Sequence, residues 1–284
     1  MMGNIGRTKK RRHEKDYIGA VAMLIVLAAI SILPLLLVIM NSFKTHIEIA
    51  RNPLTLPTSL NINNYIYTWK AGNFGHAFMN SIKVTGTATI IGVIGSTTMG
   101  YVLATRRIRT WKLLTMYFML ASTVPLQMFM LPLYKTYVDM GLLGNQYAVG
   151  VAVAAWNLPM PTFIMRTYFL KVPSELEEAA RIDGASTFQV FTRLMMPIAS
   201  PGVITVALLF GLSSWNEYLL SSTLLQGDEN FTATLKYLTL NGMFSKDFAV
   251  IMSGAVILIV PMLVVFLLLQ RKFIEGMSAG AVKS

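Results

Sequence analysis

Six stretches of the chain are apolar for about 20 residues or more, and most charged residues fall between them. An α-helix rises about 1.5 Å per residue and the hydrocarbon of a bilayer is about 30 Å thick, so each stretch is long enough to cross a membrane. The pattern therefore predicts an all-α membrane protein with six transmembrane helices. The predicted spans are Tyr17–Met40, Ser81–Ala104, Leu113–Leu133, Gln146–Tyr168, Gly202–Leu225 and Ala249–Leu269.

The composition excludes an ordinary soluble enzyme. Of the 284 residues, 54% are hydrophobic and 13% are charged, whereas a soluble domain carries about 25% charged residues. The mean hydropathy is +0.57. Because cysteine is absent, disulfides, thiolate metal sites and cysteine nucleophiles are excluded. We predict one membrane domain over residues 17–269, with a basic segment before it (1–16) and a tail after it (270–284).

The first span follows a basic run and could be taken for a signal peptide. Its apolar stretch is longer than the hydrophobic region of such a peptide, and no convincing small-residue cleavage site follows it. We therefore expect the first span to be a retained transmembrane helix.

Lysine and arginine are concentrated on alternate connections between the predicted spans. The positive-inside rule places these connections, and with them both termini, in the cytoplasm. Orientation therefore explains most of the net charge of +11. A nucleic-acid partner is not indicated, because the basic segments flank spans and contain no groove-reading motif. Seventeen of the 24 basic residues lie on this side: Arg7, Lys9, Lys10, Arg11, Arg12, Lys15, Arg106, Arg107, Arg109, Lys112, Arg166, Lys171, Arg181, Arg193, Arg271, Lys272 and Lys283.

The second span carries a small residue at every fourth position. Such a stripe lets helix backbones approach each other closely, so we expect it to be a packing face. Prolines at positions 34, 125, 132, 159, 161 and 261 each remove a backbone hydrogen bond and predict irregular helices. The stripe consists of Ala88, Gly92, Ser96, Gly100 and Ala104.

The connection between the fourth and fifth spans, residues 171–197, is too polar for a membrane and too regular for a linker. Ser174 and Glu177 have capping-box spacing, and Glu177 lies four residues before Arg181, the spacing of a helical ion pair. Gly184 is expected to end this helix with a positive φ angle. The first half of the loop therefore predicts a short helix.

A second short helix is predicted after Gly184. Ser186 and Gln189 repeat the capping-box spacing. Phe188, Phe191 and Met195 then recur on one face until Pro197 stops the pattern. An exposed apolar face on a cytoplasmic loop predicts a protein partner.

These residues resemble the EAA loop of the membrane subunits of bacterial ATP-binding cassette (ABC) importers. That loop reads Glu-Ala-Ala, three residues, Gly, nine residues, Ile, any residue, Leu, Pro. This chain has Glu178-Ala-Ala, Gly184 and Pro197 at the same spacing, with Leu194 in place of the isoleucine and Met196 in place of the leucine. Both departures conserve side-chain volume.

The resemblance implies a type I ABC importer permease bundle whose cytoplasmic loop docks in a groove of a separate ATPase subunit. The alternative is an amphipathic loop packed on the floor of the bundle. The coupling residues implied by the resemblance are Glu178, Ala179, Ala180, Asp183, Gly184 and Pro197.

Other segments resemble the carbohydrate (MalG-like, binding-protein-dependent) branch of this family. They are Asn41–Lys44, Asn63–Tyr65, Trp215–Tyr218, Gln270–Gly276 and Gly280–Lys283. The resemblance implies a heterodimer with a second permease subunit, a pair of ATPase subunits and an extracytoplasmic sugar-binding protein. It also implies the cell membrane of a bacterium or archaeon.

The chain has no Gly-x-x-x-x-Gly-Lys-Ser/Thr loop, so we do not expect it to hydrolyse ATP, and we expect no cofactor in it. ATP and Mg are expected on the partner ATPase. The three histidines are far apart, and no His-Glu-x-x-His motif or carboxylate pair at helical spacing lies in a span. Neither a catalytic set nor a metal site is therefore indicated.

Two groups of residues are candidates for the substrate pathway. Glu217 stands in the outer third of the fifth span beside Trp215 and Asn216. A charge there costs about 2.5 to 3.5 kcal/mol, so it should face the bundle or a wet path. A structural hydrogen bond to a partner subunit is the alternative. Trp156 and Asn157 precede two prolines and offer an aromatic face and an amide to a sugar. The alternative for Trp156 is an ordinary packed side chain.

The leading hypothesis is a sugar-importer permease that alternates access when ATP closes its partner subunits. Within that class, a glycerol phosphate ester is the alternative cargo, but no Arg or Lys is well placed to bind a phosphate in the pathway. In a different class, an ion-coupled secondary transporter should carry paired intramembrane charges. Glu217 has no such partner in the sequence pattern.

Overall fold

The computed structural model describes residues 3–105, 108–244 and 247–281, and these are helices joined by short connections, with no strand among them. Arg106 and Arg107, which count toward the basic asymmetry, lie outside the described residues, as do Lys246 and Lys283. The chain divides into two units. The first comprises residues 1–69 and 241–257, and the second comprises residues 70–240 and 258–284.

In the first unit, the motifs Asn41–Lys44 and Asn63–Tyr65 are joined by hydrogen bonds after the first span. Helix α1 (Gly3–Ser42) contains that span, and α3 (Asn63–Ala71) follows the first loop. The Asn64 amide donates to the carbonyls of Ser42 and Lys44, both at 2.8 Å. Tyr65 shares a hydrogen bond of 2.5 Å with Ser42. These bonds fix the direction in which the chain leaves α1.

The Lys44 side chain is fully buried in this unit and donates to the carbonyls of Asn52 (3.3 Å) and Pro53 (3.2 Å). Helix α2 (His46–Arg51) lies between Lys44 and Asn52, and its N-cap is Thr45. The Glu48 carboxylate completes a capping box with Thr45 and also accepts from the hydroxyl and the N–H of Thr58. These hydrogen bonds lower the pKa of Glu48 to about 2. The loop is thus closed by hydrogen bonds at both ends.

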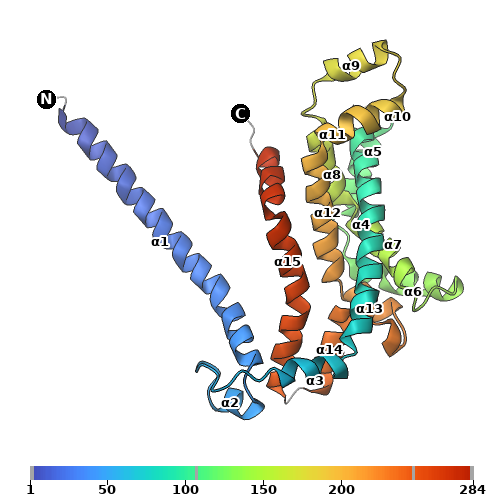
Figure 1. The fold of residues 1–284 in the computed structure, drawn as a ribbon. Coiled ribbons are helices and arrows are strands. Elements are labelled where there is room, and N and C mark those ends of the chain that lie inside the picture. Colours follow the sequence, from blue (N-terminus) through green and yellow to red (C-terminus); the bar gives the residue numbers. More distant parts are fainter. Residues whose placement is uncertain (1–2, 106–107, 245–246, 282–284) are drawn as a thin grey trace. The chain divides into compact units, whose positions relative to one another are not determined.

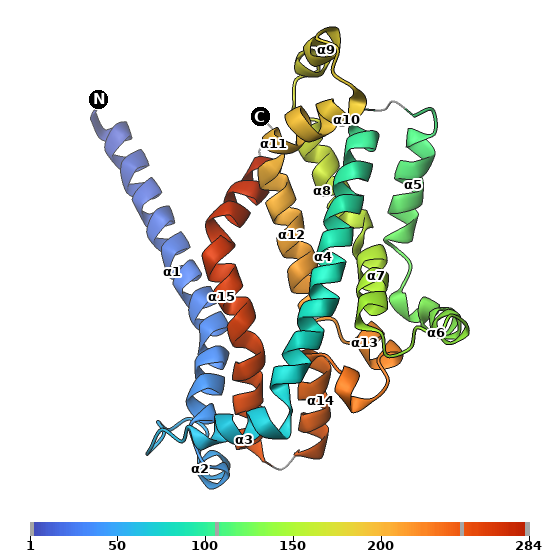
Figure 2. The same ribbon diagram turned by 45° about the vertical axis from the view of Figure 1, so that its right-hand side comes forward.

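The second unit is a bundle around α4 (Phe74–Thr105), with α7 (Gln146–Asn157), α8 (Pro159–Phe169) and α12 (Ser200–Trp215) packed against it (Figures 1 and 2). The other helices of this unit outside the coupling loop are α5 (Trp111–Ala121), η1 (Leu126–Phe129), α6 (Met130–Asp139), α13 (Leu219–Leu224) and η3 (Asp228–Asn230). Helices α14 (Ala233–Met243) and α15 (Phe248–Ala281) each belong partly to the first unit and partly to the second.

The predicted small-residue stripe is the packing face of α4. Ala88 and Ser96 are fully buried. A Cβ on Gly92 would overlap the ring of Phe210 on α12, and a Cβ on Gly100 would come within 2.7 Å of Met165 Cβ on α8. The absence of side chains at Gly92 and Gly100 therefore allows α12 and α8 to meet α4 closely.

Three of the six predicted spans are long helices, two are bent, and the fifth is interrupted after Trp215. The long helices are α1, α4 and α15, as predicted. The irregularity that the prolines predict is present in Leu113–Leu133: α5 ends at Ala121, and the chain bends by 97° before α6. Pro125 lacks an N–H and stands in the extended conformation there. Gln146–Tyr168 bends by 59° where Pro159 begins α8.

The predicted fifth span, Gly202–Leu225, is also not one helix. Helix α12 ends at Trp215, and α13 begins at Leu219. The break follows from Glu217, whose carboxylate accepts hydrogen bonds from the N–H groups of Leu220 (2.5 Å) and Ser221 (2.9 Å). A side chain that caps the next helix stabilises the start of that helix at the expense of the first one continuing.

Candidate functional site

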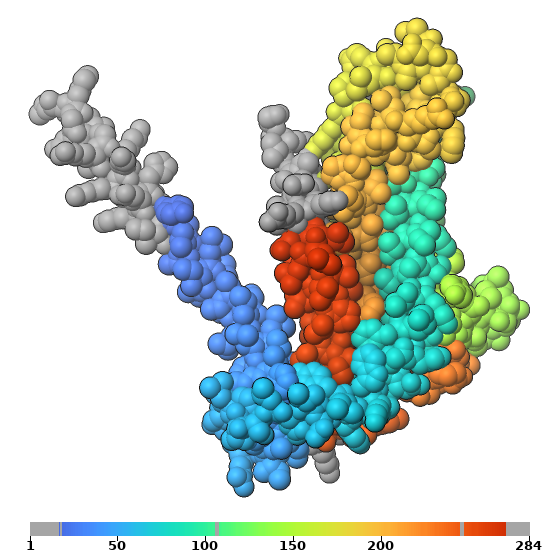
Figure 3. Space-filling model, viewed as in Figure 1, coloured from blue at the N-terminus to red at the C-terminus, as the bar shows by residue number. Residues whose placement is uncertain are grey.

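The predicted coupling loop forms one end of the second unit, where α4 and α8 finish (Figures 1 and 2). It contains α9 (Ser174–Ile182), α10 (Thr187–Gln189), a π-helical segment η2 (Val190–Met195) and α11 (Met196–Ile198). The helical path then bends by 81° into α12. The two predicted short helices are therefore present, and α9 projects from the end of the bundle in the space-filling view (Figure 3).

One of the two predicted capping boxes is formed. Ser186 caps α10: its hydroxyl accepts from Gln189 N (3.3 Å), and its own N–H donates to Gln189 Oε1 (2.8 Å). The box predicted for Ser174 and Glu177 was wrong. Pro173 occupies the N-cap position of α9, with φ −56° and ψ 133°. Its side chain makes no capping hydrogen bond to the helix. Ser174 is thereby inside the first turn, one position too late to cap it.

Gly184 ends α9 as predicted, with φ +84°. Its N–H donates to Arg181 O (3.0 Å), and the next N–H, of Ala185, donates to Ala180 O (2.9 Å). This pair of bonds is a Schellman motif, which requires a left-handed residue at the position of Gly184. No other atom lies within 4 Å of where a Cβ would stand, so the requirement for glycine within this chain is conformational.

The residues implied as coupling contacts divide into two groups by exposure. Five of them are exposed, whereas Ala180 packs with Ala185 against a buried cluster that includes Tyr101, Phe169 and Met195. Ala180 thus holds α9 against the bundle. Pro197 is exposed in α11, but it does not end the helix, which continues to Ile198. The exposed five are Glu178, Ala179, Asp183, Gly184 and Pro197.

The apolar face of the second short helix was only partly predicted. Phe188 is 74% exposed, but Met195 is buried and Phe191 turns inward, 5.1 Å from the ring of Tyr101. The wider π-helical turn of η2 explains the difference, because it breaks the 3.6-residue period on which the prediction depended. The sequence reasoning also missed Ile182, which is 87% exposed at the end of α9. The sequence signal for an exposed Ile182 is its position between two charged residues, Arg181 and Asp183.

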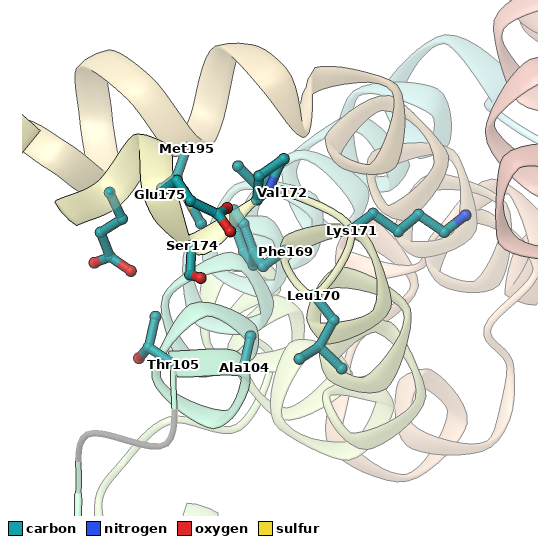
Figure 4. A pocket seen from close by; sticks show the side chains of 11 residues that line it. Ala104, Thr105, Phe169, Leu170, Lys171, Val172, Ser174, Glu175 and Met195 are labelled. Carbon is teal, nitrogen blue, oxygen red and sulfur yellow. The ribbon is translucent and has the colours of Figure 1, made fainter. Parts of the chain in front are cut away.

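A pocket of about 450 Å³ lies between the end of α4 and the start of α9. Figure 4 shows Ala104 and Thr105 on one side of it and Ser174 and Glu175 on another, with Lys171 directed away. Helix α9 therefore stands off from α4 at its beginning instead of packing flat on it.

The candidates near the end of α12 have structural partners inside this chain. Trp215 is 7% exposed, its Nε1 donates to Leu258 O (3.4 Å), and its carbonyl accepts from Thr234 (2.7 Å). Asn216 is exposed. Glu217 is half-buried and accepts from the Ser221 hydroxyl (2.7 Å) in addition to the two N–H groups. Trp215 and Glu217 therefore shape the break after α12.

Trp156 and Asn157 point to different neighbours. The side-chain Oδ1 of Asn157 accepts from the Ser213 hydroxyl of α12 (3.1 Å), which ties the break in the fourth span to the end of α12. Trp156 lines a mainly apolar pocket of about 290 Å³ and lies 5.9 Å from the ring of Phe129. Leu220, whose N–H donates to Glu217, lines the same pocket. The two groups of pathway candidates thus lie around one set of helix breaks.

A bundle of membrane-crossing helices, several of them broken, with an exposed helical loop at one end, defines the membrane component of a transporter. The chain belongs to the family described as binding-protein-dependent transport system inner membrane components, whose model matches residues 96–277. That match includes the coupling loop and the last two predicted spans.

Individual relatives agree with this family. The chain is 31% identical to the arabinooligosaccharides transport system permease protein AraQ of Halalkalibacterium halodurans, over 90% of this chain and 93% of that protein. It is 30% identical to the diacetylchitobiose uptake system permease protein NgcG of Streptomyces coelicolor, over 92% and 87%. A chain of a bacterial ABC transporter that imports the acidic polysaccharide alginate has the same fold, with a TM-score of 0.79, 22% identity and coverage of 93% and 98%.

Proposed function

We propose that this chain is the permease subunit of a carbohydrate ABC importer and alternates access under the action of separate ATPase subunits. The exposed α9, held at a fixed angle by the Gly184 Schellman motif, supports this most directly. It presents carboxylates and bulky apolar side chains to a partner from a defined end of the bundle. The oligosaccharide names of AraQ and NgcG support a carbohydrate cargo.

The partners are a second permease subunit, a pair of ATPase chains that bind ATP and Mg, and an extracytoplasmic sugar-binding protein. The cytoplasmic side carries both termini and residues 173–197, and the basic asymmetry supports this orientation. In the membrane, irregular backbone is tolerated where it is covered by protein or lines a water-filled cavity. The breaks around Trp156, Asn157, Asn216 and Glu217 therefore support a place on the substrate pathway.

The ATPase contact comprises the exposed polar residues of α9 together with two apolar residues. Glu178, Asp183 and Gly184 come from the family resemblance, and Ile182 and Phe188 come from their exposure. Two large apolar side chains on either side of a glycine turn suit a groove that buries them, because burial of each is worth about 1.5 to 3 kcal/mol. The carboxylates of Glu178 and Asp183, at the edge of this contact, then favour a basic surface on the partner.

The experiment is reconstitution of the chain in lipid vesicles with the ATPase, permease and binding-protein chains encoded beside it. We expect sugar uptake that requires ATP and the binding protein. Binding-protein-stimulated ATP hydrolysis should be lost in Phe188→Asp, whereas Leu56→Asp, at an exposed position of the loop after α1 and outside the predicted spans, should retain it. Uptake driven by an ion gradient without ATP would contradict the importer assignment. Competition by a glycerol phosphate ester, and not by sugars, would contradict the carbohydrate cargo.

A further inference from the structure

The hydroxyl of Tyr101, near the end of α4, donates a hydrogen bond of 2.7 Å to Glu177 Oε1 of α9. These residues are 76 positions apart in sequence. Tyr101 lies in the membrane helix that forms the centre of the bundle, and Glu177 lies on the helix that faces the ATPase in the proposed function. The bond therefore connects the two regions directly.

The position of the Tyr101 hydroxyl is fixed by its ring. The ring is 5% exposed and lies 5.7 Å from Phe169 of α8 and 5.1 Å from Phe191 of η2. Phe169 and Phe191 are 6.2 Å apart, so the three rings form one cluster. A hydroxyl on a packed ring has little freedom, and Glu177 must come to it.

Glu177 is also part of a polar chain that continues through the loop. Its carboxylate pairs with Arg181 at 3.4 Å, and 13% of the Glu177 side chain is exposed. The same Arg181 nitrogen donates to the Thr187 hydroxyl (3.3 Å) at the start of α10. The chain thus runs from α4 through α9 to α10.

Beside Tyr101, helix α4 packs directly against the backbone of α8. The preceding residue, Gly100, faces Met165 and the backbone nitrogen of Arg166, which a Cβ would approach to 2.9 Å. A movement delivered to Tyr101 therefore displaces α4 and α8 together. By contrast, the pocket between Thr105 and Ser174 leaves room for the start of α9 to tilt if the bond is absent (Figure 4).

We infer that Tyr101 is a positioning residue for energy coupling: its hydrogen bond to Glu177 sets the angle of α9 and passes the movement of α9 to the core of the bundle. This inference rests on the proposed function. It assigns to the second predicted span a role in coupling that extends beyond the loop itself.

The test is Tyr101→Phe in the reconstituted importer, which removes the hydroxyl and keeps the ring. A hydrogen bond to a carboxylate contributes enough that its loss changes an equilibrium by about tenfold or more. We expect binding-protein stimulation of ATP hydrolysis to fall on the order of tenfold. Hydrogen exchange of the amides over residues 176–182 should rise, while the four-chain complex assembles as the wild type does. Tyr147→Phe, at an exposed tyrosine of α7, is the matched control and should change neither measurement.

A double-mutant cycle with Glu177→Leu gives the sharper measurement. If the two residues act through one bond, Tyr101→Phe should have no further effect in the Glu177→Leu background. Full stimulation in Tyr101→Phe, additive effects in the cycle, or failure of Tyr101→Phe to assemble would each overturn the inference. The Gly184→Val variant separates it from the proposed function. If Gly184→Val loses stimulation and Tyr101→Phe retains it, only the inference fails. If both variants retain stimulation, the coupling role of the loop fails as well.

Discussion

Gly100 of α4 lies so close to Met165 of α8 that a side chain at Gly100 would need the space of the α8 backbone. A Cβ there would come within 2.7 Å of Met165 Cβ and 2.9 Å of Arg166 N. Overpacking typically costs about 1 to 3 kcal/mol. We expect Gly100→Leu to destabilise the bundle by more than this, because backbone atoms cannot rotate away. Thermal unfolding of the detergent-purified protein measures this.

Gly86 supplies the control on the same helix. No other atom lies within 4 Å of its Cβ position, so Gly86→Leu should leave the unfolding temperature close to that of the wild type. Equal stability of both variants would mean that the two helices do not meet at Gly100.

The packing face of α4 could be predicted because small residues recur at every fourth position, which depends only on helix geometry. The ends of the other helices could not. The break after Trp215 depends on Glu217 accepting the N–H groups of Leu220 and Ser221, and the apolar pattern continues through it without a signal. From the sequence alone, Glu217 is a candidate pathway residue because it is an acidic residue in a predicted span. Its immediate contacts in the structure are those of a helix cap.

The coupling loop shows the same limit. Gly184 and the Ser186 capping box were predictable, because each follows from local backbone chemistry. The inward turn of Phe191 and the bond between Tyr101 and Glu177 were not. The first depends on a π-helical segment, and the second joins residues from separate helices. Contacts of that kind follow from tertiary packing, which spacing along the chain does not encode.

Glu217 should contribute to stability whether or not it lines the pathway. Glu217→Leu leaves three donors without their acceptor, so we expect a loss of about 0.5 to 2 kcal/mol, as for other helix caps. Glu217→Gln keeps one acceptor oxygen and should retain much of the stability. Thermal unfolding and sugar uptake, measured on both variants, separate the roles. A stable Gln variant with normal uptake would leave Glu217 with the cap alone.

Glu48 should make the loop after α1 sensitive to acid. Its pKa is lowered to about 2 from an ordinary value of 4.5, so the ionised form stabilises the folded loop. A lowered pKa means that this stabilisation is complete above about pH 5, declines below the ordinary pKa, and is lost as the pH falls through about 2. Hydrogen exchange over residues 45–58 should therefore accelerate in that window beyond the intrinsic effect of pH. Glu48→Gln should remove the additional acceleration, and a wild-type loop with no such dependence would contradict the assignment.

The proposed orientation can be tested because the chain contains no cysteine. A single cysteine in place of Ser174 should not react with an impermeant thiol reagent added outside intact cells, because the coupling loop is expected in the cytoplasm. A cysteine in place of Leu56, which is exposed in the loop after α1, should react strongly. The reverse labelling pattern would overturn the topology and the coupling argument with it.

Gly184 provides the most specific test of the coupling loop. Its φ of +84° is accessible to glycine and tolerated by asparagine, but a β-branched side chain is strained there by about 1 kcal/mol or more. Gly184→Val should therefore abolish stimulation of ATP hydrolysis by sugar-loaded binding protein, through the altered turn and through obstruction of the docking surface. Membrane insertion should persist, because among the described residues nothing beyond the two chain neighbours lies within 4 Å of the new Cβ.

Gly184→Asn and Gly184→Ala separate the two causes. Asparagine keeps the turn but adds bulk at the surface, whereas alanine adds little bulk but resists the positive φ angle. If docking requires close approach, asparagine should impair stimulation more than alanine does. If the turn itself decides the activity, the order should reverse. Normal stimulation and uptake in all three variants, with the complex intact, would show that Glu178 to Pro197 is not the coupling element.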